Sequence, residues 1–180
     1  MEHRESLEDL QDIDVLRIHW GETIRHGGGH CPVCARWGSI YKRGINRTMA
    51  RSLIWLNAQE GDAEGWIDVP STGPKDVLRT NQLSTLKWWG LIQRKPNNDP
   101  KKKCSGIWRV TDAGKEFISN ATRVPKYVFT YNDDVMFVSD ETVSLGDCFL
   151  DDFDYRQVIG DLYGSNARAQ GQGQDQGDPV

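Results

Sequence analysis

The segment from Thr80 to Ile118 constrains this chain more than any other part of it. It predicts, in order, a short polar helix, a turn at Gly90, a strand, a basic loop, a second strand and the start of another helix. Together these elements are expected to form a two-stranded basic flap beside a polar helix. We therefore expect a small fold of the α+β class.

The polar helix of this segment has two different faces. One side carries leucine and tryptophan, and the positions between them carry side chains that form hydrogen bonds. These polar residues are Asn81, Gln82, Ser84, Thr85 and Lys87. Such side chains can donate to and accept from base edges in a major groove. Gly90 then supplies the positive backbone angle that ends a helix.

The loop at residues 95–106 is rich in proline, asparagine and lysine. Because it can neither bury apolar area nor sustain a strand ladder, it is predicted to be solvated and positively charged. Ile107–Val110 returns as a strand by its β-branched and aromatic content. Thr111 or Asp112 is expected to cap the helix that follows.

The letters GLIQRK, the basic tip and IWRVTDAGKEFI resemble the wing of winged helix-turn-helix regulators, especially those of the MarR type. The resemblance implies a recognition helix at Arg79 to Trp89, with residues 80–89 in the major groove and the wing at residues 95–106 on phosphates or in the minor groove. Taken with the polar pattern, it gives these DNA-binding residues: Arg79, Asn81, Gln82, Ser84, Thr85, Lys87, Arg94, Lys95, Lys101, Lys102 and Lys103.

Charge is segregated along the chain, although the formal net charge is only −4. Residues 31–126 hold 17 Lys and Arg against 8 Asp and Glu, whereas residues 1–30 hold 3 against 7 and residues 127–180 hold 2 against 11. A basic middle with acidic ends is typical of a nucleic-acid module with solubilising or autoinhibitory ends. Ordinary surface variation is the alternative.

The sequence HCPVCARWG contains Cys31 and Cys34 at the spacing of one half of a zinc site. His26 and His30 are the most economical further ligands, and the other candidates are His19, Cys104 and Cys148. A redox pair or two unligated thiols are the competing interpretations. Zinc bound here is expected to be structural, because no Glu or Asp nearby supplies a general base.

We divide the chain into a winged-helix domain with additions at both ends. The expected parts are an acidic segment at 1–30, the cysteine knuckle at 31–44, the winged-helix domain at 45–123, an acidic extension at 124–163 and a disordered tail at 164–180. Asn46 is expected to cap the first helix of the domain. The extension is predicted to contain a β-hairpin between Tyr127 and Val138, and to serve in dimerisation, partner binding or occupation of the basic surface.

These features predict a cytoplasmic double-stranded DNA-binding protein, a transcriptional or phage regulatory factor. The small mosaic build is similar to that of phage and mobile-element regulators. A protein-interaction adaptor that uses the winged domain and the acidic end to bind or inhibit a partner protein is the alternative, and a homodimer is compatible with both. We expect no enzyme, because no group of residues has the pattern of acid-base or nucleophilic chemistry. No apolar run is long enough for a membrane span.

Overall fold

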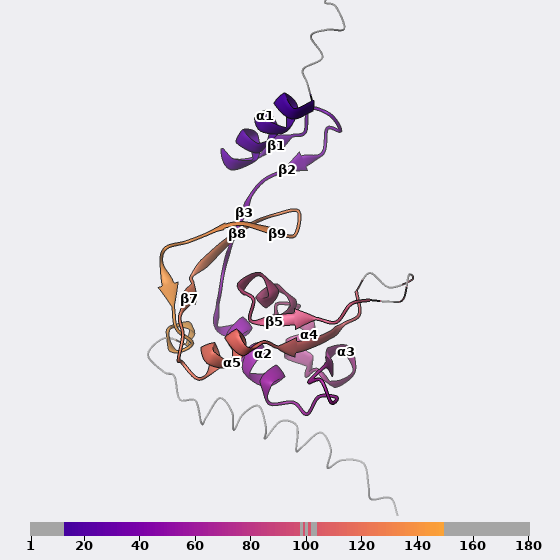
Figure 1. Cartoon of the computed structure of the whole chain (residues 1–180), viewed down its shortest axis with the longest axis vertical. Helices are drawn as coiled ribbons and strands as arrows, with labels where there is room; N and C mark the ends of the chain where they lie inside the picture. The colour runs from indigo at the N-terminus through magenta and orange to yellow at the C-terminus, as the bar shows by residue number, and fades with distance from the viewer. Residues whose placement is uncertain (1–12, 98, 100, 102–103, 150–180) are drawn as a thin grey trace, which may run out of the picture. The chain divides into compact units, whose positions relative to one another are not determined.

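The computed structural model describes residues 13–97, 99, 101 and 104–149, and these residues form two compact units. Unit 1 contains residues up to Arg43 together with Val128–Val138, and unit 2 contains Gly44–Tyr127 together with the residues from Ser139 onward. Helices and antiparallel sheets occur in the same chain (Figure 1), which confirms the α+β class.

Unit 1 is built from one helix, a short knuckle of two paired strands, and a hairpin. Its elements are α1 (Ile13–Arg25), β1 (Gly29–His30), β2 (Trp37–Gly38), β3 (Tyr41–Gly44), β8 (Tyr127–Tyr131) and β9 (Asp134–Val138), of which β3 and β8 reach across the unit boundary by one residue each. The last three strands form a sheet in the order β3-β8-β9. Trp20 of α1 donates a hydrogen bond of 3.0 Å from its indole nitrogen to the Tyr131 hydroxyl. The strands β8 and β9 pair antiparallel, which confirms the predicted hairpin between Tyr127 and Val138.

Unit 2 contains the main hydrophobic core. Its elements up to Ile118 are α2 (Arg47–Asn57), β4 (Ile67–Asp68), α3 (Val69–Thr72), α4 (Lys75–Thr80), the 3-10 helix η2 (Leu83–Trp89), β5 (Ile92–Arg94), β6 (Ile107–Val110) and α5 (Asp112–Ile118). The three strands form an antiparallel sheet in the order β4-β6-β5. Asn46 caps α2, since its side-chain oxygen accepts a hydrogen bond of 3.1 Å from the Met49 N–H. Trp55, Leu86 and Phe117 are fully buried.

The single helix expected from Arg79 to Trp89 is wrong. The α4 helix ends at Thr80, and Asn81 adopts a left-handed conformation with φ 50°. The next turns are 3-10, a geometry that places side chains three residues apart above one another. Leu83 and Leu86 use this spacing to enter the core, and Asn tolerates the left-handed angle better than most residues.

The extension expected at residues 124–163 does not form a unit of its own. Residues 128–138 belong to unit 1, whereas residues 139–149 belong to unit 2. There β7 (Val124–Pro125) pairs with β10 (Thr142–Val143), and the 3-10 helix η3 (Gly146–Cys148) follows. The reason is apolar burial, since Leu145 and Phe149 are only 1% and 2% exposed within the core of unit 2.

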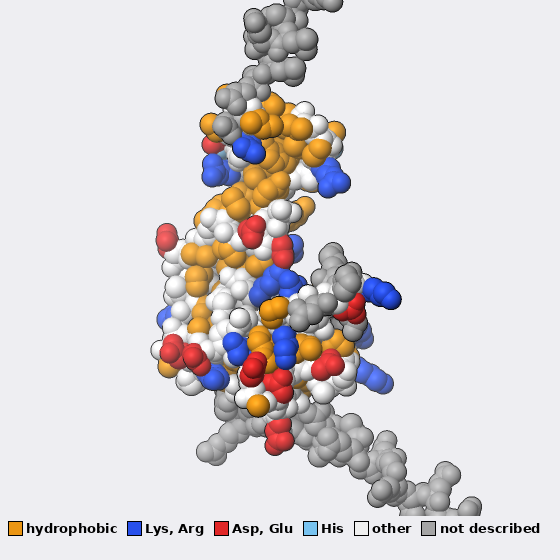
Figure 2. Space-filling view, turned by 45° about the vertical axis from the view of Figure 1, so that its right-hand side comes forward, with side chains coloured by type: hydrophobic (Ala, Val, Ile, Leu, Met, Phe, Trp, Pro, Cys, Tyr) orange, Lys and Arg blue, Asp and Glu red, His pale blue; other side chains and the backbone are white. Residues whose placement is uncertain are grey.

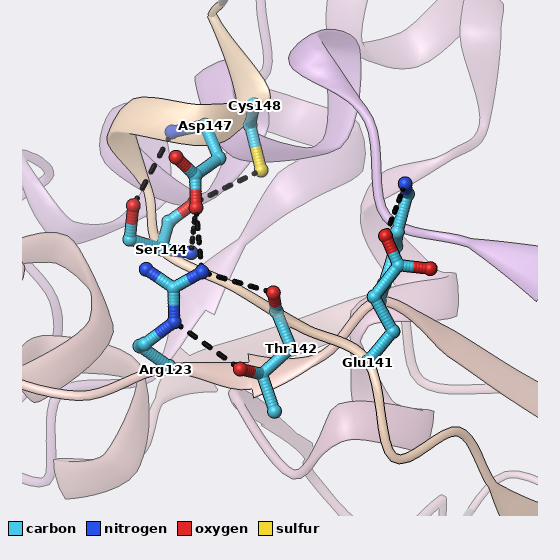
Figure 3. A network of polar contacts seen from close by, with 7 residues as sticks. Arg123, Glu141, Thr142, Ser144, Asp147 and Cys148 are labelled. Carbon is cyan, nitrogen blue, oxygen red and sulfur yellow. Dashed lines mark hydrogen bonds and ion pairs between the residues drawn. The ribbon is translucent and has the colours of Figure 1, made fainter.

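Polar contacts hold the same segment in place (Figure 3). The guanidinium of Arg123 donates to the Thr142 carbonyl oxygen and to the Asp147 carboxylate, both at 2.9 Å. Lys126 Nζ lies 2.6 Å from Glu141 Oε1, and this hydrogen bond raises the pKa of Lys126. The segments predicted at 1–12, at Phe153–Leu162 and at 164–180 lie outside the described residues.

Candidate nucleic-acid interface

The polar residues of the predicted recognition helix differ in the exposure and hydrogen bonding of their side chains. The Asn81 side chain is exposed at the break between α4 and η2. The Ser84 and Thr85 hydroxyls donate to the backbone carbonyls of residues 81 and 82, at 3.4 Å and 2.6 Å. Gln82 is half-buried, and its side-chain oxygen has no hydrogen-bond partner among the described residues. Asn81 is therefore the amide best placed to meet an outside ligand.

A pocket of about 320 Å³ lies where η2 faces the β5–β6 hairpin. It brings together four of the residues predicted from the sequence, which are Asn81, Ser84, Lys87 and Arg94. Its apolar lining includes Leu83 and Trp108, and the Arg94 guanidinium carbon lies 6.0 Å from the centre of the Trp108 ring. The register of the hairpin causes this arrangement, because Arg94 pairs directly with Trp108.

Lys95 has other partners. Its ammonium lies 3.4 Å from the Asp62 carboxylate and 5.6 Å from the centre of the Trp66 ring. A backbone hydrogen bond from Trp66 is the main cause of the lowered pKa of Asp62. A backbone hydrogen bond from Glu64 and the hydrogen bond and charge of Lys95 lower this pKa further. Lys95 therefore neutralises a carboxylate of its own chain.

Two polar residues near Trp66, Gln93 and Arg109, were not predicted as site residues from the sequence. Arg109 places its guanidinium carbon 4.3 Å from the centre of the Trp66 ring and donates a hydrogen bond of 2.8 Å to the Gln93 side-chain oxygen. Both line a pocket of about 440 Å³ that also contains Asp112 and Lys115. The cross-strand pairing of residues 93 and 109 creates this contact, and the register was not available from the sequence.

The basic loop at residues 95–106 is described only in part. Lys101 is exposed, and its backbone N–H donates 2.9 Å to the Asp99 carboxylate. Lys102 and Lys103 lie outside the described residues. At the base of the loop, the Ser105 hydroxyl donates 2.7 Å to the Lys95 carbonyl oxygen. Across the described parts of unit 2, Arg79 and Lys101 form no ion pair, so their charges are available to an anionic partner.

The cysteine pair of unit 1 sits in a tight turn between β1 and β2. Its ends are held by the Cys31 N–H, which donates 2.8 Å to the Arg36 carbonyl, and by the Ala35 N–H, which donates 2.9 Å to the Cys31 carbonyl. Ala35 has a φ of 57°, in the left-handed region. Backbone hydrogen bonds from Cys34 and then Val33 lower the pKa of the Cys31 thiol. The turn thus favours a thiolate, the form that binds metals.

The histidines expected to complete a zinc site have different neighbours. His30 Nδ1 lies 2.9 Å from the Ala35 carbonyl oxygen, and His26 Nδ1 lies 2.9 Å from the Glu22 carbonyl oxygen. Within the ranges that the structure describes, no three His, Cys, Asp or Glu side chains gather where they could hold a metal ion. The set of Cys31, Cys34, His26 and His30 is therefore not assembled within the described part of one chain.

The other two cysteines belong to unit 2. Burial, followed by the charge of Asp147, raises the pKa of Cys148 to about 11, and its thiol lies 3.5 Å from the Ser144 carbonyl oxygen. Cys104 is exposed within the basic loop. Cys148 is thus a protonated packing residue, unlike Cys31.

Comparison with protein-family models, curated proteins and solved structures finds no match for this chain. None of the helices in the described ranges has the length and apolar character needed to cross a membrane.

Proposed function

We propose that unit 2 is a winged-helix domain that binds double-stranded DNA and acts as a regulatory factor. The order of elements from α2 to β6 supports this, because short helices precede a basic hairpin. The sheet order β4-β6-β5 supports it as well, since β4, which lies between α2 and α3, pairs with β6, the returning strand of the hairpin. In this proposal the β5–β6 hairpin is the wing.

One observation carries the proposal most strongly. The pocket between η2 and the hairpin joins the Asn81 amide to the cations Lys87 and Arg94. An exposed amide can donate and accept at a base edge, while neighbouring cations bind the phosphates that flank it. Arg79 on the last turn of α4 and Lys101 on the loop add charge without ion pairs in the described chain. Lys102 and Lys103 extend the basic tip in sequence.

The test is fluorescence anisotropy of the full chain with a mixed-sequence duplex, repeated over a range of salt concentrations. Each phosphate contact that is lost should reduce the slope of log K against log salt by roughly one unit. We therefore expect the double variant R79A/R94A to bind more weakly and with a slope shallower by about two.

A matched control removes one cation elsewhere in unit 2. Lys115→Ala deletes a lysine that is paired with Asp112 at 3.2 Å on α5, so its effect on the slope should be small. An R79A/R94A slope equal to that of the wild-type chain would refute this DNA-binding surface.

A protein-interaction adaptor is the second candidate. Leu78 lines the same pocket and is 43% exposed, which suits an apolar partner side chain better than a phosphate. A full chain that binds no duplex even at low salt would favour this function. Two variants of this pocket, Arg94→Ala and Leu78→Asp, would then be used to map the protein partner.

A further inference from the structure

Unit 1 holds most of the exposed large hydrophobic residues of the described chain. Of the eleven large hydrophobic residues that are exposed, all except Leu78 belong to unit 1. Figure 2 shows hydrophobic side chains spread over the body that carries α1. By contrast, the hydrophobic core cluster lies in unit 2, and among the described residues of unit 1 only the hydrophobic side chains of Ile24 and Val128 are buried. Small folding units with so few buried apolar residues are usually completed by a metal or by oligomerisation.

The outer strand of the unit 1 sheet, β9, likewise buries little of its apolar surface. All five residues of β9 are exposed, and its apolar run from Val135 to Val138 ranges from 40% to 50% exposure. Adjacent residues of a strand point to opposite faces, so both faces of β9 present apolar side chains. Within the described chain β9 pairs on one side only, with β8. Such an edge is suited to contact with another chain.

The cysteine turn adds a chemical requirement. Zinc in structural sites binds four ligands in a tetrahedron, and the turn supplies two cysteine sulfurs. Cys34 is exposed, and Val33 between the two cysteines is 65% exposed at the tip of the turn. The described residues bring no third ligand to them. An ion held here would therefore present its remaining two positions outward.

We propose that two copies of this chain share one zinc ion, with Cys31 and Cys34 of each copy as its four ligands. A two-fold axis through the ion would give both copies the same contact, as in most homodimers. The dimer would cover Val33 and the neighbouring Trp37, which is 57% exposed. Binding releases the four thiol protons to solvent, and Arg36, which lines the pocket of about 390 Å³ beside the cysteines, offsets part of the charge of the thiolates.

The test combines zinc content with oligomeric state. The full chain is purified with a phosphine reductant, and its mass is measured by sedimentation equilibrium before and after a zinc chelator. We expect a dimer with one zinc per two chains, and a monomer after chelation. Zinc-edge X-ray absorption should show four sulfur ligands at about 2.3 Å. Cys34→Ser should give a monomer without zinc, and Cys104→Ser, in unit 2, should leave the dimer unchanged.

Several results would overturn this assignment. They are one zinc per monomer with mixed nitrogen and sulfur ligands, a dimer that survives chelation, and a reduced chain that binds no zinc. A second variant covers the case in which Cys34→Ser does not fold. Val33→Glu keeps both thiols and places charge at the exposed tip, so the dissociation constant of the zinc-bound dimer should rise at least about tenfold. An unchanged constant would refute the interface. DNA binding by unit 2 is a separate measurement and does not decide this one.

Discussion

The Thr111 hydroxyl donates a hydrogen bond of 2.6 Å to the carbonyl oxygen of Gly90. The Thr111 hydroxyl oxygen also accepts a hydrogen bond of 3.1 Å from the Gly114 N–H and so caps α5. Gly90, with φ 69°, is the residue that ends η2. One side chain therefore joins the end of η2 to the start of α5, and the β5–β6 hairpin lies between these two points in the sequence. The base of the hairpin is held by this bond.

Replacement of Thr111 by Val keeps the shape of the side chain but removes both hydrogen bonds. We expect the free energy of unfolding to fall by about 2 kcal/mol, since a lost cap costs about 1 kcal/mol and a second lost bond a similar amount. Urea denaturation of the full chain measures this loss. Thr111→Ser retains the hydroxyl and should recover most of it. A Val variant as stable as the wild-type chain would show that the bond contributes nothing.

Gly114 has no room for a side chain. A Cβ there would collide with the Leu91 carbonyl oxygen and approach Val110 Cγ1 to 2.7 Å. Gly114→Ala should therefore lower the free energy of unfolding by about 1–3 kcal/mol, despite the better helix propensity of alanine. Gly146→Ala is the matched control, because the nearest atom to its added Cβ is Ser144 Oγ at 3.8 Å. Thermal unfolding of the two variants should separate them clearly. Equal midpoints would contradict the close packing at Gly114.

Local patterns predicted local structure well. The caps at Asn46 and Thr111 and the left-handed Gly90 are each decided by a few neighbouring residues, and each is confirmed. The break at Asn81 was missed, because the helical period of the surrounding leucines also fits a 3-10 turn.

The features that the sequence could not predict depend on contacts between residues far apart in the chain. The contact of Arg109 with Gln93 depends on strand register. The assignment of residues 139–149 to unit 2 depends on Leu145 and Phe149 entering a core built from distant segments. Cys31 and Cys34 lie in one turn because only two residues separate them, whereas the positions of His26 and His30 relative to the cysteines depend on how the chain folds around that turn.

Asp147 links stability to pH. Hydrogen bonds from the Ser144 backbone and then the Ser144 side chain, followed by the charge of Arg123, lower its pKa from the usual 3.8. A carboxylate with a lowered pKa stabilises the fold above its unfolded pKa, and this contribution is lost as the pH falls through the lower folded value. Asp147→Asn should thus lower the thermal midpoint at neutral pH, and the difference from wild type should shrink below about pH 4.

The control for this pH series is Asp140→Asn, at an exposed residue that follows β9. It should follow the wild-type midpoint at every pH. A gap between wild type and Asp147→Asn that stays constant from pH 7 down to strongly acid pH would show that the carboxylate does not act through its charge.

Asn81 allows the side chain and the backbone to be tested apart. Its φ of 50° is strained for most residues but not for glycine. Asn81→Gly should therefore keep the stability of unit 2 while removing the amide, and Asn81→Ala should remove the amide and also cost about 1 kcal/mol of stability. If the amide reads a base, both variants should lose about tenfold in the ratio of affinities for a selected duplex and for the same duplex with its contacted base pair changed. Anisotropy at one fixed salt concentration measures this ratio. A preserved ratio in Asn81→Gly would place sequence recognition elsewhere on the chain, even if the salt dependence of binding remained steep.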